Sequence, residues 1–129
     1  MDARDIKPIS EHAKKCSDLA ITAMRTFKCM EVVYQGEERT VEVHAVGWNA
    51  EWQYIMQVWQ VRGGSRSGQP EGWKFMLLDD VLSFRLSETT SLAPRVSYRA
   101  PSQSMRVIDA VEFPIIPSVQ IKKTGGGMR

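Results

Sequence analysis

Residues 52–78 read "WQYIMQVWQVRGGSRSGQPEGWKFMLL", and this stretch predicts two β-strands joined by a long loop. The first run, 52–61, places bulky apolar side chains on both of its faces. One face holds Trp52, Tyr54, Met56 and Val58, and the other holds Ile55, Trp59 and Val61. Gly, Ser, Arg, Gln and Pro make up most of residues 62–72, and a second apolar run follows at 73–78. A strand that is apolar on both faces is typical of a small barrel or a covered sheet.

Further strands are predicted on either side of this stretch. Residues 28–34 and 39–46 are β-rich and flank a turn at Gly36, and residues 82–88 predict a later strand. Before that last strand, Asp79 and Asp80 are typical of a short capped helical turn. In 39–46 the alternation predicts Val41, Val43 and Ala45 on one face, and Thr40, Glu42, His44 and Val46 on the other.

Residues 5–27 predict a helix that begins near an N-cap at Ser10. Its apolar stripe recurs at three- and four-residue spacing and comprises Ile9, Ala13, Cys16, Ala20, Ala23 and Phe27. Since no long helical pattern separates the strands, a parallel α/β sheet is disfavoured. We therefore expect a mostly-β fold with an N-terminal helix, in the form of a small SH3/Sm-like antiparallel β-barrel of 4–6 strands.

Composition indicates one globular domain. The chain has 129 residues, of which 43% are hydrophobic and 25% charged. We expect a barrel domain over residues 1–110 and a partly flexible tail over 111–129, in which the apolar run 111–121 adds an edge strand or docks on a partner. With two unpatterned cysteines, no leader pattern and no apolar run that could span a bilayer, we expect a cytoplasmic protein without a membrane partner.

Basic residues outnumber acidic ones in residues 58–129, and most of them are arginines. Arginine pairs bidentately with phosphate and stacks on bases, so this bias favours an anionic ligand. A solvated surface with both signs mixed is the alternative. The loop 62–72 likewise has two interpretations, as a backbone cradle for an anion or as an exposed hairpin loop, because it lacks the lysine and glycine spacing of nucleotide-binding loops.

Enzyme chemistry is not expected. His12 and Cys16 lie four residues apart on the predicted helix, but no second ligand pair completes a metal site. Cys16 lies on the core stripe, and no base accompanies Ser65 or Ser67 in the sequence. We therefore expect no catalytic residues, no metal and no cofactor.

Two segments resemble the WYL domain family. They are "RTVEVHAVGWNAEWQYIMQVWQVRGGSRSGQPEGWKFMLLDDVLSF" (39–84) and "APRVSYRAPS" (93–102), and the likeness extends over roughly residues 15–105. The resemblance implies a stand-alone Sm-like, SH3-type barrel with an N-terminal helix. It also implies ligand sensing, since WYL domains are thought to bind nucleotides or single-stranded nucleic acid. Many sit in bacterial transcription regulators, including those near phage-defence systems, and they frequently dimerise.

Departures from the family pattern fall on its charged positions. Leu77 stands where the family usually has a ligand-contacting arginine, and Asp80 replaces a basic residue. Val43 replaces a proline, whereas His44 and Asp79 keep the family residues. Since one helix and one strand precede the clear match, we expect no helix-turn-helix there.

Two functions are weighed. The first is a WYL-like regulatory or accessory protein that binds a nucleotide or a single-stranded nucleic acid. Its expected ligand-binding residues are Arg39, Arg62, Arg66 and Lys74 for charge, Tyr54, Trp59 and Trp73 for stacking, His44 and Gln60 for polar edges, and Asp79 by family match. The second is a protein-interaction or oligomerisation module with no nucleic-acid ligand, which the loss of arginine at Leu77 and the apolar tail favour. Partners would be a regulatory protein or a second copy in a dimer.

Overall fold

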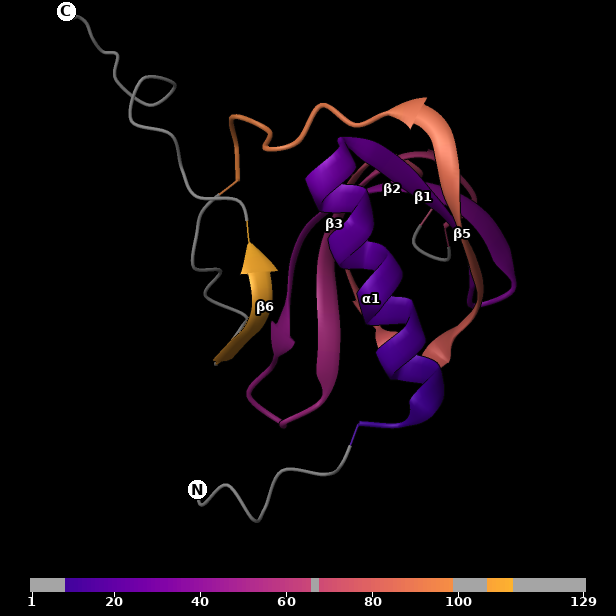
Figure 1. The fold of residues 1–129 in the computed structure, drawn as a ribbon. Helices are drawn as coiled ribbons and strands as arrows, with labels where there is room; N and C mark the ends of the chain where they lie inside the picture. The colour runs from indigo at the N-terminus through magenta and orange to yellow at the C-terminus, as the bar shows by residue number, and fades with distance from the viewer. Residues whose placement is uncertain (1–8, 66–67, 99–106, 113–129) are drawn as a thin grey trace, which may run out of the picture.

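The computed structural model describes residues 9–65, 68–98 and 107–112, and it confirms a mostly-β fold with one helix at the N-terminal side (Figure 1). The elements are α1 (Glu11–Thr26), β1 (Lys28–Tyr34), β2 (Glu37–Trp48), β3 (Tyr54–Gly63), β4 (Gly72–Leu77), the short 3-10 helix η2 (Leu78–Asp80), β5 (Val81–Thr90) and β6 (Val107–Glu112). No helix within the described ranges combines the length and apolar character that a bilayer crossing requires.

The sheet is barrel-like but open. Its strands follow the order β4-β3-β2-β1-β5, with every neighbouring pair antiparallel. β6 pairs with the second half of β2, opposite Ala45, Gly47 and Trp48, where β1 no longer pairs with it. The edge strand expected in 111–121 therefore begins earlier, at Val107, and residues 113–121 lie outside the described ranges.

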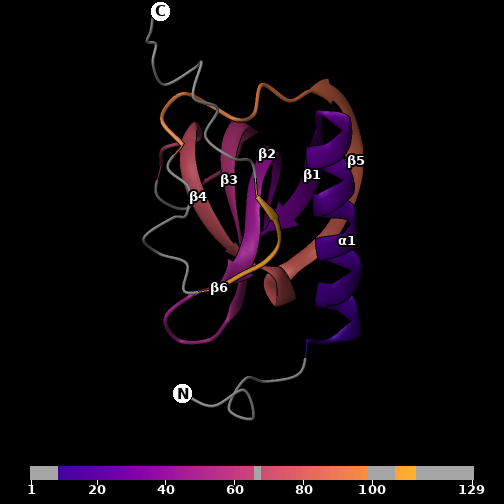
Figure 2. The same ribbon diagram turned by 60° about the vertical axis from the view of Figure 1, so that its left-hand side comes forward.

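Figure 2 shows α1 lying along one side of the sheet, and the main core is made of buried side chains from the helix and from the strands. The small side chains of the helix stripe allow close packing, and Ala13, Cys16, Ala20 and Ala23 are all buried. Phe27 does not belong to this stripe. It ends the helix in a left-handed conformation, with φ of 57°, and its side chain is 52% exposed.

A β-bulge in β2 changes which side chains face the helix. Val43 lies opposite Val58, but Ala45 lies opposite Gln57, so His44 is an extra residue in its strand. After this bulge Val46 joins Val41 and Val43 in the main core, whereas Ala45 packs with Ile55 on the opposite face. The predicted grouping of Ala45 with Val41 and Val43 is therefore wrong, because strict alternation breaks at the bulge.

We call the side of the sheet that faces away from α1 the outer face.

Ser10 caps α1 as expected and also joins the helix to the sheet. Its Oγ accepts a hydrogen bond from the Ala13 N–H at 3.0 Å and donates one to Asp79 Oδ1 at 2.5 Å. Asp79 belongs to η2, which confirms the helical turn predicted at Asp79 and Asp80. Asp79 thus contacts the start of the helix.

Replacing Ser10 with Ala should lower the free energy of unfolding by about 1 kcal/mol, because the Ala13 N–H and the Asp79 carboxylate both lose their partner. Thr22→Ala is the matched control, since the Thr22 hydroxyl bonds only within an exposed part of the same helix. It should cost less than about 0.5 kcal/mol. Equal losses for the two variants in urea unfolding would contradict a tertiary role for the cap.

Candidate functional site

The outer face carries a buried carboxylate at its centre. Glu42 lies between Val41 and Val43, whose side chains enter the core, so its own side chain points to the outer face. It is only 1% exposed. Its Oε1 accepts a hydrogen bond from Arg95 Nε at 2.6 Å, and its Oε2 accepts bonds from Arg95 Nη2 at 3.3 Å and from the Leu92 N–H at 2.7 Å. The negative charge is therefore neutralised inside the protein.

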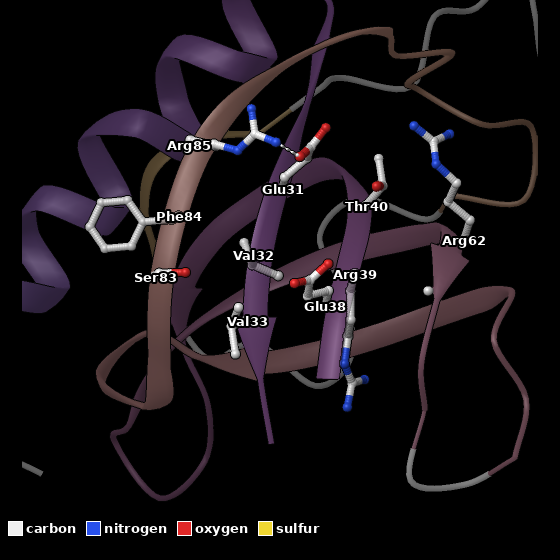
Figure 3. Close-up of a pocket in the computed structure, with 11 residues that line it drawn as sticks. Glu31, Val32, Val33, Glu38, Arg39, Thr40, Arg62, Ser83, Phe84 and Arg85 are labelled. Carbon is white, nitrogen blue, oxygen red and sulfur yellow. Dashed lines mark ion pairs between the residues drawn. The ribbon is translucent and has the colours of Figure 1, made fainter. Parts of the chain in front are cut away.

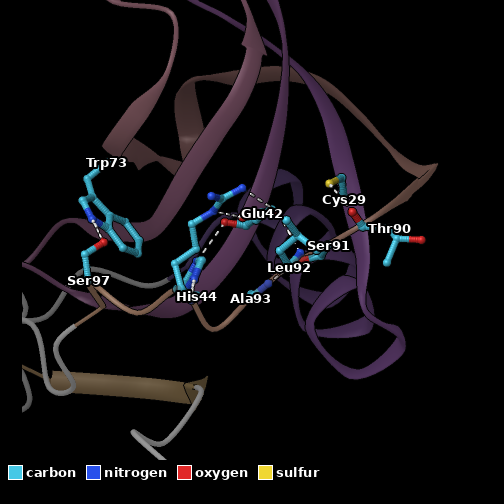
Figure 4. Close-up of polar contacts among 10 residues, drawn as sticks. Cys29, Glu42, His44, Trp73, Thr90, Ser91, Leu92, Ala93 and Ser97 are labelled. Atoms are coloured by element: carbon cyan, nitrogen blue, oxygen red, sulfur yellow. Dashed lines mark hydrogen bonds and ion pairs between the residues drawn. The ribbon is translucent and has the colours of Figure 1, made fainter. Parts of the chain in front are cut away.

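These bonds hold residues 91–98, which we call the strap, across the outer face. The strap leaves the end of β5, where the Ser91 N–H donates to the Phe27 carbonyl oxygen at 2.8 Å. It then passes Glu42, His44 and Trp73, as the sticks in Figure 4 show. Leu92 and Val96 point outward and are 67% and 80% exposed.

His44 is completely buried beneath the strap. Its Nε2 accepts the backbone N–H of Arg95 at 3.1 Å, which places the ring proton on Nδ1, and Nδ1 donates to the Glu42 carbonyl oxygen at 3.1 Å. Burial lowers the pKa of His44 to about 4, so the ring is neutral near pH 7. The Nε2 of His44, which was expected to bond a ligand, is therefore bonded to the strap.

Aromatic rings surround this histidine. Trp73 meets His44 edge-on at 4.7 Å between ring centroids and meets Trp59 edge-on at 5.3 Å, while Tyr98 tilts against His44 at 5.0 Å. The Trp73 Nε1–H donates to Ser97 Oγ at 3.0 Å. The structure therefore brings together three of the predicted residues, His44, Trp59 and Trp73, on the outer face.

Arg95 completes this cluster and was not among the expected site residues. Its guanidinium lies 4.6 Å above the Trp59 ring centroid, in cation–π geometry, while two of its nitrogens bond Glu42. The sequence prediction of the site included none of Glu42, Arg95 and Tyr98. Two features of the sequence point to them. Glu42 is a charged residue inside an alternating strand, and Arg95 and Tyr98 belong to the Pro-Arg-x-x-Tyr segment 94–98.

A groove of about 440 Å³ lies across β1, β2, β3 and β5 (Figure 3). It is lined by Glu31, Val32, Val33, Glu38, Arg39, Thr40, Arg62, Gly63, Ser83, Phe84 and Arg85. Arg62 Nη2 donates to the Thr89 hydroxyl at 2.9 Å. Arg85, whose side chain is 74% exposed, pairs with Glu31. Arginine and hydroxyl donors at such a groove are suited to bind an anion.

Arg39 lines the groove but is mostly engaged inside the protein. It is 4% exposed, and its nitrogens donate to Gln60 Oε1 at 3.4 Å and to Gln35 Oε1 at 3.2 Å. Burial lowers the pKa of Arg39. Figure 3 shows its guanidinium turned away from the pair formed by Glu31 and Arg85. Gln60 is fully buried and donates to the Gly64 carbonyl oxygen at 2.9 Å. Arg39 and Gln60 therefore fasten the start of the loop to the sheet.

The loop after β3 is held by its own contacts. Lys74 Nζ donates to Ser65 Oγ at 2.9 Å and to the Gln69 carbonyl oxygen at 2.7 Å. Gly63 adopts φ of 115°, and a Cβ added there would lie 2.3 Å from the Glu38 carbonyl oxygen, so this close approach requires glycine. Arg66 lies outside the described residues. Lys74 thus holds the loop that was considered as an anion cradle.

Two predicted residues lie away from the outer-face cluster. Tyr54 is 8% exposed and its ring tilts against Trp48 within the core, with 4.9 Å between the ring centroids, so it offers little surface to a ligand. Asp79 contacts the helix cap. Within the described part of the chain, no group of three or more His, Cys, Asp or Glu side chains is placed to hold a metal ion.

The chain was compared with family models, curated proteins and solved structures. No family model, no curated protein and no solved structure matches the chain.

We predict that the free energy of unfolding falls as the pH is lowered from about 6.5 toward 4, in part because of His44. In this range the unfolded chain protonates the ring, whereas the folded protein keeps it neutral because its pKa is about 4. The contribution reaches at most about 3 kcal/mol at the acid end of the range. Urea unfolding of the wild type and of His44→Gln, measured between about pH 7 and pH 4.5, isolates this contribution, because the carboxylates titrate in both proteins. Identical pH slopes would show that His44 plays no part.

Proposed function

We propose that this protein binds a nucleotide or a single-stranded nucleic acid through its phosphate, and that Arg62 is the principal contact. The observation that carries the proposal is the groove of Figure 3, which Arg62 and Arg85 line together with the buried Arg39 and with Glu31 and Glu38. The hydroxyls of Thr40 and Ser83 line the same cavity and can donate further hydrogen bonds.

Arg62 is favoured over its neighbours by what it already contacts. Its hydrogen bond goes to a neutral hydroxyl, that of Thr89, which a phosphate can replace without separating an ion pair. Arg85 would have to exchange Glu31 for the ligand, and Arg39 is buried among amide groups. The expected contribution of Arg39 and Lys74 is therefore indirect, through the position of the loop.

A regulatory or accessory role in the cytoplasm, as a dimer, follows from the resemblance to WYL domains and belongs to the same proposal. In such a role, ligand binding at the groove would be read by a partner protein or by a second copy. The groove and the strap lie on the same face of the sheet, which gives a bound ligand and a partner a shared surface.

The charge contribution is tested by titrating a labelled single-stranded oligonucleotide at low and moderate salt. Arg62→Ala should weaken binding roughly tenfold to a hundredfold and reduce the slope against salt by about one counterion, since one charge-assisted phosphate contact is lost. Arg25→Ala is the matched control, because Arg25 lies in the last turn of α1, away from the groove. Absence of binding by folded wild type at low salt would overturn the proposal, and so would equal affinities for the wild type and Arg62→Ala.

A second candidate is a protein-interaction or oligomerisation module, which one observation favours. In the part of the chain that the structure describes, β5 pairs only with β1, and its side chains Leu82 and Leu86 are 69% and 38% exposed. Such an edge can accept a strand from another protein.

If β5 is an interface between two copies, light scattering should give a dimer for the wild type and a monomer for Leu82→Lys, because a lysine on an edge strand opposes pairing. Thr22→Lys, at an exposed position on α1 and outside β5, is the control for added charge and should stay dimeric. A monomeric wild type at high concentration would contradict this second candidate.

A further inference from the structure

The guanidinium of Arg95 is held by two contacts. Its Cζ lies 4.6 Å over the Trp59 ring centroid, and its Nε donates to the buried carboxylate of Glu42 at 2.6 Å. The Arg95 side chain keeps 27% of its surface exposed. Trp59 covers one side of the guanidinium and Glu42 binds one edge, so the exposed surface of Arg95 lies outside these two contacts.

The partly exposed Arg95 side chain lies next to Arg62 on the outer face. In the pairing of β2 with β3, Glu42 is opposite Trp59, and Thr40 is opposite Arg62. Glu42 and Thr40 are two residues, roughly 7 Å, apart on one face of β2, and a register shift adds one residue between their partners Trp59 and Arg62 on β3.

The thiol of Cys29 reports the same proximity. Burial raises its pKa to about 11, with a further increase from Glu42, while Arg62 and Arg95 both act to lower it. Both guanidinium groups therefore act on the same buried sulfur. Arg62 and the contact between Arg95 and Trp59 are therefore neighbours on the outer face.

We propose that the plane of Arg95, stacked on Trp59, is the base-binding platform of this protein. The inference rests on the proposed function and narrows its ligand to nucleoside phosphates and single strands that carry bases, as opposed to bare anions. Arginine stacks well because its guanidinium is planar and weakly hydrated. Since Glu42 and Trp59 already hold it in place, little conformational entropy is lost when a base stacks on it. Stacking alone gives no preference among the bases.

The test compares two oligonucleotides of equal length, one with bases and one abasic, by titration against the full chain. The strand with bases should bind at least about fivefold more tightly, the lower end of what one stacked base contributes. Arg95→Lys keeps a positive charge opposite Glu42 but lacks the plane, so it should remove the preference for bases while abasic binding persists. Arg25→Lys, in the last turn of α1 and outside the groove, is the control and should leave the ratio of the two affinities unchanged.

The outcomes separate this inference from the proposed function. Equal affinities of the wild type for the two strands, with binding that still depends on Arg62, would overturn the platform and leave the anion site standing. A base preference that survives in folded Arg95→Lys would also overturn the platform. Failure of folded wild type to bind either strand would overturn both. If Arg95→Lys does not fold, the wild-type comparison decides alone.

Discussion

A carboxylate in the middle of a sheet face must be neutralised, and in this protein that constraint determines what covers the sheet. Glu42 is almost completely buried and receives its hydrogen bonds from Arg95 and from the Leu92 backbone. Both partners belong to the strap, so the strap has to lie where the carboxylate is. The burial of His44 and the stacking of Arg95 on Trp59 follow from that placement. Removing either charge would leave the other without its partner in a partly desolvated site.

The secondary structure could be predicted from local patterns, but the faces of β2 could not. The bounds of β1 and the cap at Ser10 agree with the sequence prediction, because turn residues, β-branched residues and capping oxygens act over a few positions. The bulge at His44 adds one residue against β3, and nothing in the alternation 39–46 marks it. Whether a period of two continues or shifts depends on the partner strand, which the local sequence does not specify.

The candidate site was predicted only in part, because its residues also depend on contacts between distant segments of the chain. His44, Trp59 and Trp73 come together because they lie on neighbouring strands of one face. The basic residues divide differently, since Arg39 and Lys74 find partners inside the protein while Arg62 lines a groove. Composition shows how many arginines a chain has, but their partners are set by tertiary contacts. Arg95 lies far from β2 in sequence, so only the folded chain brings it to Glu42.

The contact between Glu42 and Arg95 also bears on the order in which the chain can fold. The two residues are 53 positions apart, and the cap contact between Ser10 and Asp79 joins residues 69 positions apart. Contacts this distant are slow to form, because a long segment must be ordered before they stabilise it. During synthesis, the hairpin of β1 and β2 emerges with a bare carboxylate on its surface well before Arg95 leaves the ribosome. Until then water solvates Glu42, and the outer face is covered only after the strap has been synthesised.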